Sequence, residues 1–270
     1  MQELYETRKE EMDTSFLPLT RENLQKIKNK EFCIIQVPVF SKSVCEQLLT
    51  EFSNVPFPWT KFRRAEAVQH VPLMGISLWD YYDDLRDYVM SSLKLDALLN
   101  KYVPTRKAAI AIIRAMLKEA NGADVGPVFI EQYQAHGFTG MGKHLFYANT
   151  HTDFVPRDAP DDFPFPKIKN QIAMNLVLSD VPEGAGGECL VFNKMYEPED
   201  DAYLLPPPTS FGYRSDLFLD VEFKAIPQVQ GSFFIFPSEY YHCVLPCQAD
   251  RYTMSFFMGE LEDGRLAMWT

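Results

Sequence analysis

The pattern of apolar and polar positions changes character near residue 125. Before that point, apolar residues recur at spacings of three and four, which is the spacing of one face of a helix. This periodicity predicts helices over 43–52, 78–101 and 105–120, after an arm or surface helix over 1–30 and a strand over 31–39. Beyond residue 125, short apolar and aromatic runs alternate with Gly, Pro, Asn and Asp, as in a β-sandwich or barrel.

Two of the predicted helices have recognisable ends. Ser43 and Glu46 have the spacing of a capping box, which predicts that a helix begins there. Pro104 and Gly122 bound the third helix, because proline is tolerated at a first helical position and glycine commonly follows a last one. We therefore expect a helix-rich support over 1–125.

Seven runs in the second half have the length and composition of strands. They are 128–134, 172–179, 188–193, 217–225, 232–236, 240–245 and 251–260. Asp263-Gly264 is a turn sequence and predicts a last hairpin. No internal repeat is evident, so we expect a single domain over 1–270 whose mostly β core covers 126–262.

Two long segments of this half are rich in proline and acidic residues, namely 156–166 and 197–208. Long loops of this kind are either lids over a functional site or plain surface loops. The sequence leaves both possibilities open.

Composition narrows the class of protein. The 270 residues are 46% hydrophobic and 14% aromatic, which indicates a folded chain with a sizeable core. A net charge of -11 argues against a nucleic-acid partner, because such binding depends on clustered Lys and Arg. The start, Met1 to Asp13, is charged, and no apolar run of about 18 residues occurs, so we expect a cytoplasmic protein without membrane contact. The five cysteines lack paired spacings and are expected to be free thiols.

The chemistry-bearing residues begin with the sequence His151-Thr-Asp153. If the backbone there is extended, side chains two apart point to one side and can share one metal ion. His242, in a later β-type run, can supply a third ligand. Two imidazoles and one carboxylate are the ligand set of the facial triad that holds non-haem Fe(II) with open positions. His-x-Asp by itself arises easily by chance, so its context has to decide.

Arg251 opens the next predicted strand, nine residues after His242. Alternation places Arg251, Thr253 and Ser255 on one face of that strand, with Tyr252, Met254 and Phe256 on the other. An arginine on a strand that faces a pocket can hold a carboxylate through two parallel hydrogen bonds, with hydroxyl groups completing the contact.

This order of parts resembles the Fe(II)- and 2-oxoglutarate-dependent dioxygenases, and in particular their prolyl-4-hydroxylase-like branch. Leu178-Ser-Asp-Val181, Gly186-Gly-Glu188 and Phe192 are similar to a run of that branch, and Gly231 to Phe236 resembles the strand that leads to the distal histidine. The likeness covers about residues 126 to 260. It implies a double-stranded β-helix of jelly-roll, cupin-like type with flanking helices.

The resemblance also implies roles for the residues above. His151, Asp153 and His242 would be ligands of Fe(II), and Arg251 would contact the distal carboxylate of 2-oxoglutarate. Thr253 or Ser255 would be an auxiliary contact.

Two more residues are candidates for the co-substrate site. Tyr133 resembles a tyrosine that often contacts 2-oxoglutarate, although its distance in sequence from His151 is longer than usual. Asn175 is polar among apolar neighbours, so it either faces the pocket or caps a backbone group. Asp153 is the carboxylate that related halogenases lack, and its presence disfavours halogenation.

The implied activity is oxidation of an unactivated C–H bond of a small molecule, such as an amino acid or a natural-product intermediate. Hydroxylation is the usual outcome, with 2-oxoglutarate and O2 converted to succinate and CO2. Desaturation, ring closure and hydroxylation of a peptidyl or prolyl substrate remain alternatives.

Three other classes of protein fit the sequence less well. Gly137 to His144 nearly matches a phosphate-binding loop, but His144 stands where Ser or Thr is needed and no helix is predicted after it. A non-catalytic jelly-roll binding protein would not need the joint occurrence of both histidines, Asp153 and Arg251. The H-x-H pair of metal-binding cupins is absent.

Overall fold

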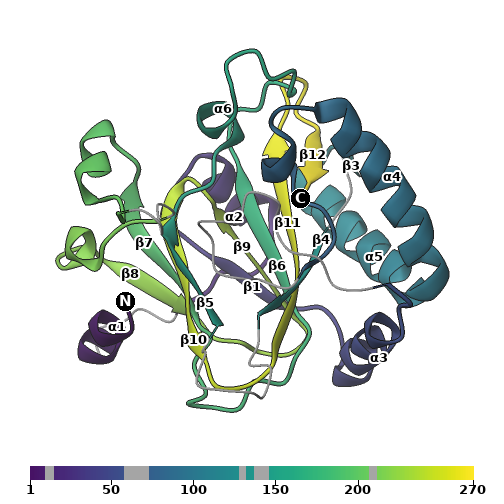
Figure 1. Ribbon diagram of the computed structural model, residues 1–270, viewed down its shortest axis with the longest axis horizontal. Coiled ribbons are helices and arrows are strands. Elements are labelled where there is room, and N and C mark those ends of the chain that lie inside the picture. Colours follow the sequence, from purple (N-terminus) through teal and green to yellow (C-terminus); the bar gives the residue numbers. More distant parts are fainter. Residues whose placement is uncertain (10–14, 58–72, 128–131, 137–145, 207–211) are drawn as a thin grey trace.

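The computed structural model describes residues 1–9, 15–57, 73–127, 132–136, 146–206 and 212–270, and two β-sheets with a group of helices make up its architecture (Figure 1). The sheets form a double-stranded β-helix, so the predicted jelly-roll fold with flanking helices is confirmed. Among the described residues, no helix has the length and apolar character needed to cross a membrane.

The major sheet has eight described strands in the order β1-β9-β6-β11-β12-β3, with β4 paired to β11 and β2 paired to β4. All neighbours are antiparallel except β12 and β3. The strands are β1 (Ile35–Pro38), β2 (Leu73–Met74), β3 (Val125–Pro127), β4 (Gln132–His136), β6 (Ile172–Val177), β9 (Ser232–Pro237), β11 (Arg251–Glu260) and β12 (Leu266–Trp269).

The minor sheet has four described strands in the antiparallel order β5-β10-β7-β8. They are β5 (Phe146–His151), β7 (Cys189–Met195), β8 (Phe223–Ile226) and β10 (Tyr240–Cys247). Its inward face opposes the major sheet, and an apolar cluster that includes Val191, Phe234 and Phe236 lies between the two.

Helices cover the outer faces of both sheets (Figure 1). The α-helices are α1 (Gln2–Arg8), α2 (Arg21–Lys28), α3 (Lys42–Ser53), α4 (Leu85–Tyr102), α5 (Pro104–Asn121) and α6 (Val155–Asp158), and the 3-10 helices are η2 (Leu78–Tyr81), η3 (Pro198–Tyr203) and η4 (Ser215–Phe218). Side chains of α2 to α5, such as Leu48 and Ile113, share one core with major-sheet residues such as Met254 and Phe256. In contrast, α1 packs its Leu4 against the outer face of the minor sheet.

Most predicted elements are present, and both ends of the third predicted helix are correct. The third predicted helix is α5, with Pro104 in its first turn and Gly122 at its C-cap in the left-handed conformation. The predicted last hairpin joins β11 to β12 through Asp263-Gly264, where Gly264 has φ of +82°. All five cysteines are free thiols.

Two helix predictions were wrong in detail. The helix predicted over 78–101 is interrupted: 3-10 helix η2 comes first, and α4 begins only after Asp84, whose carboxylate accepts a hydrogen bond from the Asp87 amide at 2.9 Å. The spacing of apolar residues could not reveal this break, because Leu78 and Tyr81 of the first piece and Tyr88 of the second are buried in one apolar cluster. The capping box at Ser43 is also wrong, since the N-cap of α3 is Ser41.

Strand predictions failed where apolar runs were ambiguous. The run predicted as a strand over 217–225 is a 3-10 helix, η4, followed by the short strand β8. Phe218 is buried in either conformation, so burial alone could not decide. Strand β5 was not predicted, and residues 128–131 of another predicted strand lie outside the described residues.

Candidate functional site

The two histidines of the candidate site meet across neighbouring strands of the minor sheet. His242 of β10 is the register partner of His151, the last residue of β5, and their ring centroids lie 4.4 Å apart. The alternation of β10 decides where His242 points, because Tyr241, Cys243 and Leu245 are buried on the outer face against α1. His242 is therefore directed into the space between the sheets.

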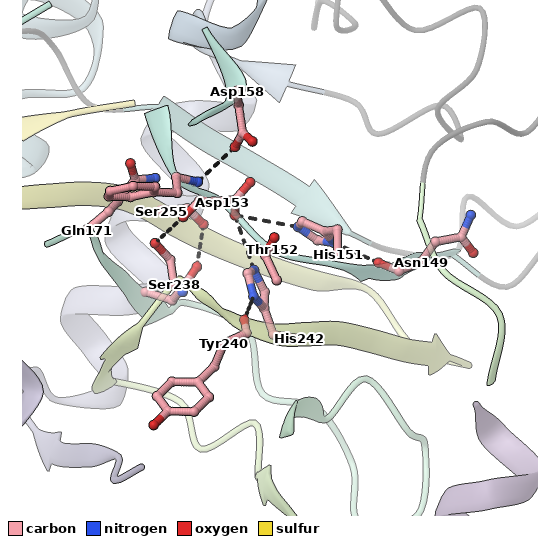
Figure 2. A network of polar contacts seen from close by, with 12 residues as sticks. Asn149, His151, Thr152, Asp153, Asp158, Gln171, Ser238, Tyr240, His242 and Ser255 are labelled. Carbon is pink, nitrogen blue, oxygen red and sulfur yellow. Dashed lines mark hydrogen bonds and ion pairs between the residues drawn. The ribbon is translucent and has the colours of Figure 1, made fainter. Parts of the chain in front are cut away.

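Asp153 joins them because its backbone is held from two sides just after β5. The Asp153 amide donates to the Ser238 carbonyl at 2.9 Å, and the Ser238 hydroxyl donates to the Asp153 carbonyl at 2.9 Å. The carboxylate Oδ2 then lies 3.6 Å from His151 Nε2 and 3.2 Å from His242 Nε2. These side chains face one another in Figure 2. The three residues that the sequence singled out thus lie together in space.

The ring orientations are set by the backbone. Nδ1 of His151 contacts the Asn149 carbonyl at 2.7 Å, and Nδ1 of His242 contacts the Tyr240 carbonyl at 2.9 Å. A carbonyl only accepts, so each Nδ1 carries a proton, and in the neutral form of each ring Nε2 keeps its lone pair. Both lone pairs belong to the nitrogens nearest Asp153. One donor atom from each of the three residues lies within 4.8 Å of the others, a group that can hold a metal ion, and no other such group occurs among the described residues.

The electrostatics of this cluster favour a charged Asp153. Burial would raise the pKa of the Asp153 carboxyl, but the two imidazoles outweigh burial and lower that pKa. Burial would lower the pKa of His151, but the Asp153 carboxylate outweighs burial and raises that pKa. Burial, together with repulsion from His151 when that ring is protonated, lowers the pKa of His242. An anionic carboxylate beside a neutral imidazole is the protonation state in which such residues bind a cation.

The three residues open into one cavity of about 430 Å³ between the sheets. We call the part of the cavity that is lined by Arg251, Asn175 and Ser255 of the major sheet its inner part. We call the outer part the portion of the cavity whose lining is mainly aromatic and apolar, with two charged side chains: Leu78, Trp79, Tyr82, Phe154, Val155, Arg157, Asp158, Leu204, Tyr213, Phe257 and Trp269.

Arg251 is the buried cation of the inner part, with 2% of its surface exposed. Its Nε donates to Gln228 Oε1 at 2.8 Å, whereas its Nη1 is buried and has no hydrogen-bond partner in the described part of the chain. Burial lowers the pKa of Arg251 to about 10, so the guanidinium is charged at neutral pH. A buried cation with an unsatisfied donor beside a cavity is a site for an anionic ligand.

The neighbouring predicted residues lie beside Arg251, but not all reach the cavity. Ser255 donates to Asn175 Oδ1 at 2.6 Å, and both line the cavity, so the pocket-facing alternative for Asn175 is the correct one. Thr253 is buried next to Ser255, with its hydroxyl 3.3 Å away, and is not part of the lining. Tyr133 pairs through its backbone with Met254, and its side chain lies outside the described residues, so its role stays a prediction.

Several residues of the site were not found from the sequence. Gln228, between β8 and β9, carries no motif, and only its contact with Arg251 reveals it. Trp79 and Trp269 line the outer part from η2 and β12, about 190 residues apart in the chain. The abundance of aromatic residues signalled an apolar pocket without indicating which of them form it.

The phosphate-loop alternative fails on the structure that follows it. Residues 137–144 lie outside the described residues, but the segment after them is strand β5. A phosphate loop requires a helix there, because the helix N-terminus holds the phosphate.

Neither a protein-family model nor a curated protein matches the sequence. Solved structures share the fold. An N-substituted L-amino acid dioxygenase from Burkholderia ambifaria AMMD is similar at a TM-score of 0.57 and 12% identity, over 93% of this chain and 91% of the other. The structure of that dioxygenase in complex with α-ketoglutarate has a TM-score of 0.56 and 13% identity, over the same shares of the two chains. SnoN, a non-haem α-ketoglutarate-dependent epimerase from nogalamycin biosynthesis, has a TM-score of 0.50 and 16% identity, over 89% of this chain and 83% of the other. The chain thus has the fold of the 2-oxoglutarate-dependent oxygenases.

Proposed function

We propose that this protein is an Fe(II)- and 2-oxoglutarate-dependent dioxygenase that hydroxylates an unactivated C–H bond of a small molecule. The observation that carries the proposal is the convergence of His151, Asp153 and His242 in one cavity with the buried, incompletely paired Arg251. The fold shared with oxygenases of this kind supports the proposal independently of that geometry.

The donor set fits Fe(II). Two neutral imidazole nitrogens and one carboxylate oxygen supply three ligands from one side, which leaves other positions open, unlike a closed structural zinc site. The hydrogen bonds of both Nδ1 atoms keep the rings turned toward Asp153. With iron bound, the group supplies oxidation of a C–H bond by O2, coupled to conversion of 2-oxoglutarate to succinate and CO2.

The inner part of the cavity fits 2-oxoglutarate. Its distal carboxylate would accept hydrogen bonds from Arg251, whose Nη1 lacks a partner among the described residues, with the Ser255 hydroxyl beside it. The proposed ligand side chains stand on the minor sheet and Arg251 stands on the major sheet, so a dicarboxylate would span the two.

The outer part of the cavity is where the substrate would bind. Tyr82, Trp79 and Trp269 contribute aromatic surface to the lining, which would pack against an apolar carbon skeleton and exclude water. The two charged side chains there, Arg157 and Asp158, form an ion pair with each other at 2.5 Å. A largely apolar chamber with one ion pair suits a small organic molecule, such as a substituted amino acid or a natural-product intermediate.

The site admits other outcomes of the same chemistry. The SnoN structure belongs to an epimerase, so the fold serves reactions in which no oxygen is added to the product. Desaturation and ring closure are likewise decided by how the substrate is positioned. Mass spectrometry of the product separates these cases, since hydroxylation adds one oxygen, desaturation removes two hydrogens and epimerisation leaves the mass unchanged.

The first experiment tests the proposed ligands. His151→Ala, Asp153→Ala and His242→Ala should each abolish Fe(II) binding and succinate formation, because two remaining ligands hold the ion weakly. Asp161→Ala, an exposed aspartate in the loop that follows α6, is the control and should behave as wild type. Succinate formation at the wild-type rate in any of the three variants would refute the ligand assignment.

The second experiment seeks the substrate. Purified protein with Fe(II), 2-oxoglutarate and ascorbate is screened against amino acids, N-substituted amino acids and small aromatic or alicyclic carboxylates, with succinate release as the readout. Compounds that raise succinate formation above the basal rate are then tested by mass spectrometry. If succinate appears only with a prolyl peptide, the peptide alternative replaces the small-molecule one.

A further inference from the structure

The guanidinium of Arg251 is held by a neutral partner. Its Nε donates to Gln228 Oε1 at 2.8 Å, and none of the described carboxylates forms an ion pair with it. Glu188 is close enough to raise the pKa of Arg251 by its charge, but no hydrogen bond or ion pair joins the two side chains in the described part of the chain. A buried arginine usually has a carboxylate partner, so the amide is an unusual choice.

Gln228 is itself fixed within the segment between β8 and β9. Its Nε2 donates to the Ile226 carbonyl at 3.3 Å, which identifies Oε1 as the atom that faces Arg251. The segment is attached to its surroundings by the Gly231 amide, which donates to the Val177 carbonyl at 2.8 Å, and by Gln230, which donates to the Leu178 carbonyl at 2.8 Å. The acceptor is thus presented to Nε from a defined position.

Gly187 lies against the aliphatic part of the same side chain. A Cβ at this position would lie 3.0 Å from Arg251 Cδ and 3.0 Å from Cys247 Sγ. The aliphatic part of Arg251 is therefore confined against Gly187 while Nε is bound to Gln228. A guanidinium fixed at Nε presents its two terminal nitrogens, which are the ones that pair with a carboxylate.

We propose that Gln228 is a positioning residue for co-substrate binding, which orients Arg251 toward the distal carboxylate of 2-oxoglutarate without neutralising its charge. The amide supplies the same acceptor geometry as a carboxylate. Because it is uncharged, the full positive charge of Arg251 remains for the ligand, in a cavity where the dielectric is low. This inference rests on the proposed function, since it assigns a residue to the proposed co-substrate site.

Two substitutions separate orientation from charge. Gln228→Ala removes the acceptor and should weaken 2-oxoglutarate binding about tenfold, as expected for a hydrogen bond to a charged group. Gln228→Glu keeps the acceptor geometry but adds a negative charge, and should weaken binding further, about a hundredfold. A purely structural role predicts the opposite order, with Gln228→Glu similar to wild type. Gln25→Ala, at an exposed glutamine of α2 that donates to Asn29 Oδ1 far from this segment, is the control and should bind as wild type.

The measurement is calorimetric titration of Mn(II)-loaded protein, in which no turnover occurs, with 2-oxoglutarate and with 2-oxobutyrate, which lacks the distal carboxylate. In both Gln228 variants the affinity for 2-oxobutyrate should stay within about twofold of wild type, so that only the preference for 2-oxoglutarate falls. Unchanged affinity for 2-oxoglutarate in Gln228→Ala, or an equal loss for both ligands, would overturn the orienting role. Wild-type affinity in Gln228→Glu would overturn the role of neutrality. Failure of wild-type protein to bind 2-oxoglutarate would instead remove the proposed function, and this inference with it.

Discussion

At the scale of single residues, the candidate site depends on groups that never touch a ligand. The carbonyls of Asn149 and Tyr240 select the tautomers of His151 and His242. Ser238 holds the backbone of Asp153 through its own carbonyl and its hydroxyl. Ser238 is completely buried. Such outer contacts orient ligands and are expected to tune metal affinity.

Ser238→Ala should therefore weaken metal binding about tenfold without unfolding the protein, because only the hydroxyl contact to the Asp153 carbonyl is lost. Mn(II) titration is the measurement. Ser232→Ala is the matched control, since its hydroxyl is also buried but donates to the Val229 carbonyl at 2.7 Å, within the segment between β8 and β9. Equal affinities of the two variants would show that the Ser238 hydroxyl does not position Asp153.

At the scale of elements, turns and helix ends fix the strands that carry the site. Gly186 and Gly187, in the turn that leads into β7, both have positive φ and lie against the end of β10. A Cβ on Gly186 would lie 2.1 Å from the Pro246 carbonyl oxygen. Gly184, in the same turn, has a similar φ of +79°, but a Cβ at that position would meet no described atom within 4 Å.

Comparison of Gly184 with Gly186 separates the cost of a steric clash from the cost of the left-handed backbone conformation. Gly184→Ala should lower the free energy of unfolding by about 1 kcal/mol, the cost of a left-handed conformation for alanine. Gly186→Ala should cost at least about 2 kcal/mol more, because the backbone of β10 would have to move. Denaturant unfolding measures both values. Equal losses would mean that the turn relaxes freely around Gly186.

Helix α4 offers a second test at this scale. Asp84→Ala should lower the free energy of unfolding by about 1 kcal/mol, because the carboxylate that accepts from the Asp87 amide is lost at the N-cap. Asp84→Asn keeps an acceptor at that position and should cost much less. If both variants were equally destabilised by thermal unfolding, capping would not be the reason that α4 begins there.

At the scale of the whole molecule, the cavity joins the two sheets. The proposed metal ligands belong to β5, to the residues that follow it and to β10, whereas Arg251 begins β11 of the major sheet. A metal ion and a dicarboxylate bound together would therefore link the sheets through one continuous set of contacts. Ligands that bind only the folded chain raise its stability as their concentration exceeds their Kd.

Mn(II) and 2-oxoglutarate together should raise the free energy of unfolding by about 2.7 kcal/mol for each ligand present at about a hundred times its Kd. Chelation of the metal should reverse both contributions, because the co-substrate needs the metal to bind. The measurement is thermal unfolding of the protein with Mn(II) alone, with 2-oxoglutarate alone and with both. In Asp153→Ala neither ligand should stabilise the protein, and stabilisation by Mn(II) in that variant would place the metal elsewhere.

The sequence by itself determined the class of fold and which candidate residues would be brought together. His151, Asp153, His242 and Arg251 were identified from residue type, spacing and resemblance, and period-two alternation correctly placed Ser255 on the same face as Arg251, toward the cavity. These inferences succeed because ligand chemistry and strand alternation are local properties of the chain.

Only the tertiary structure decided what surrounds those residues. Gln228 forms a hydrogen bond with Arg251, and Trp79 and Trp269 belong to one apolar cluster and line one cavity, only because the fold brings these segments together. The same holds for Asn175, whose pocket-facing position depends on its register opposite Ser255. Contacts between residues far apart in sequence depend on strand order and register, and no local pattern of apolar and polar positions specifies either one.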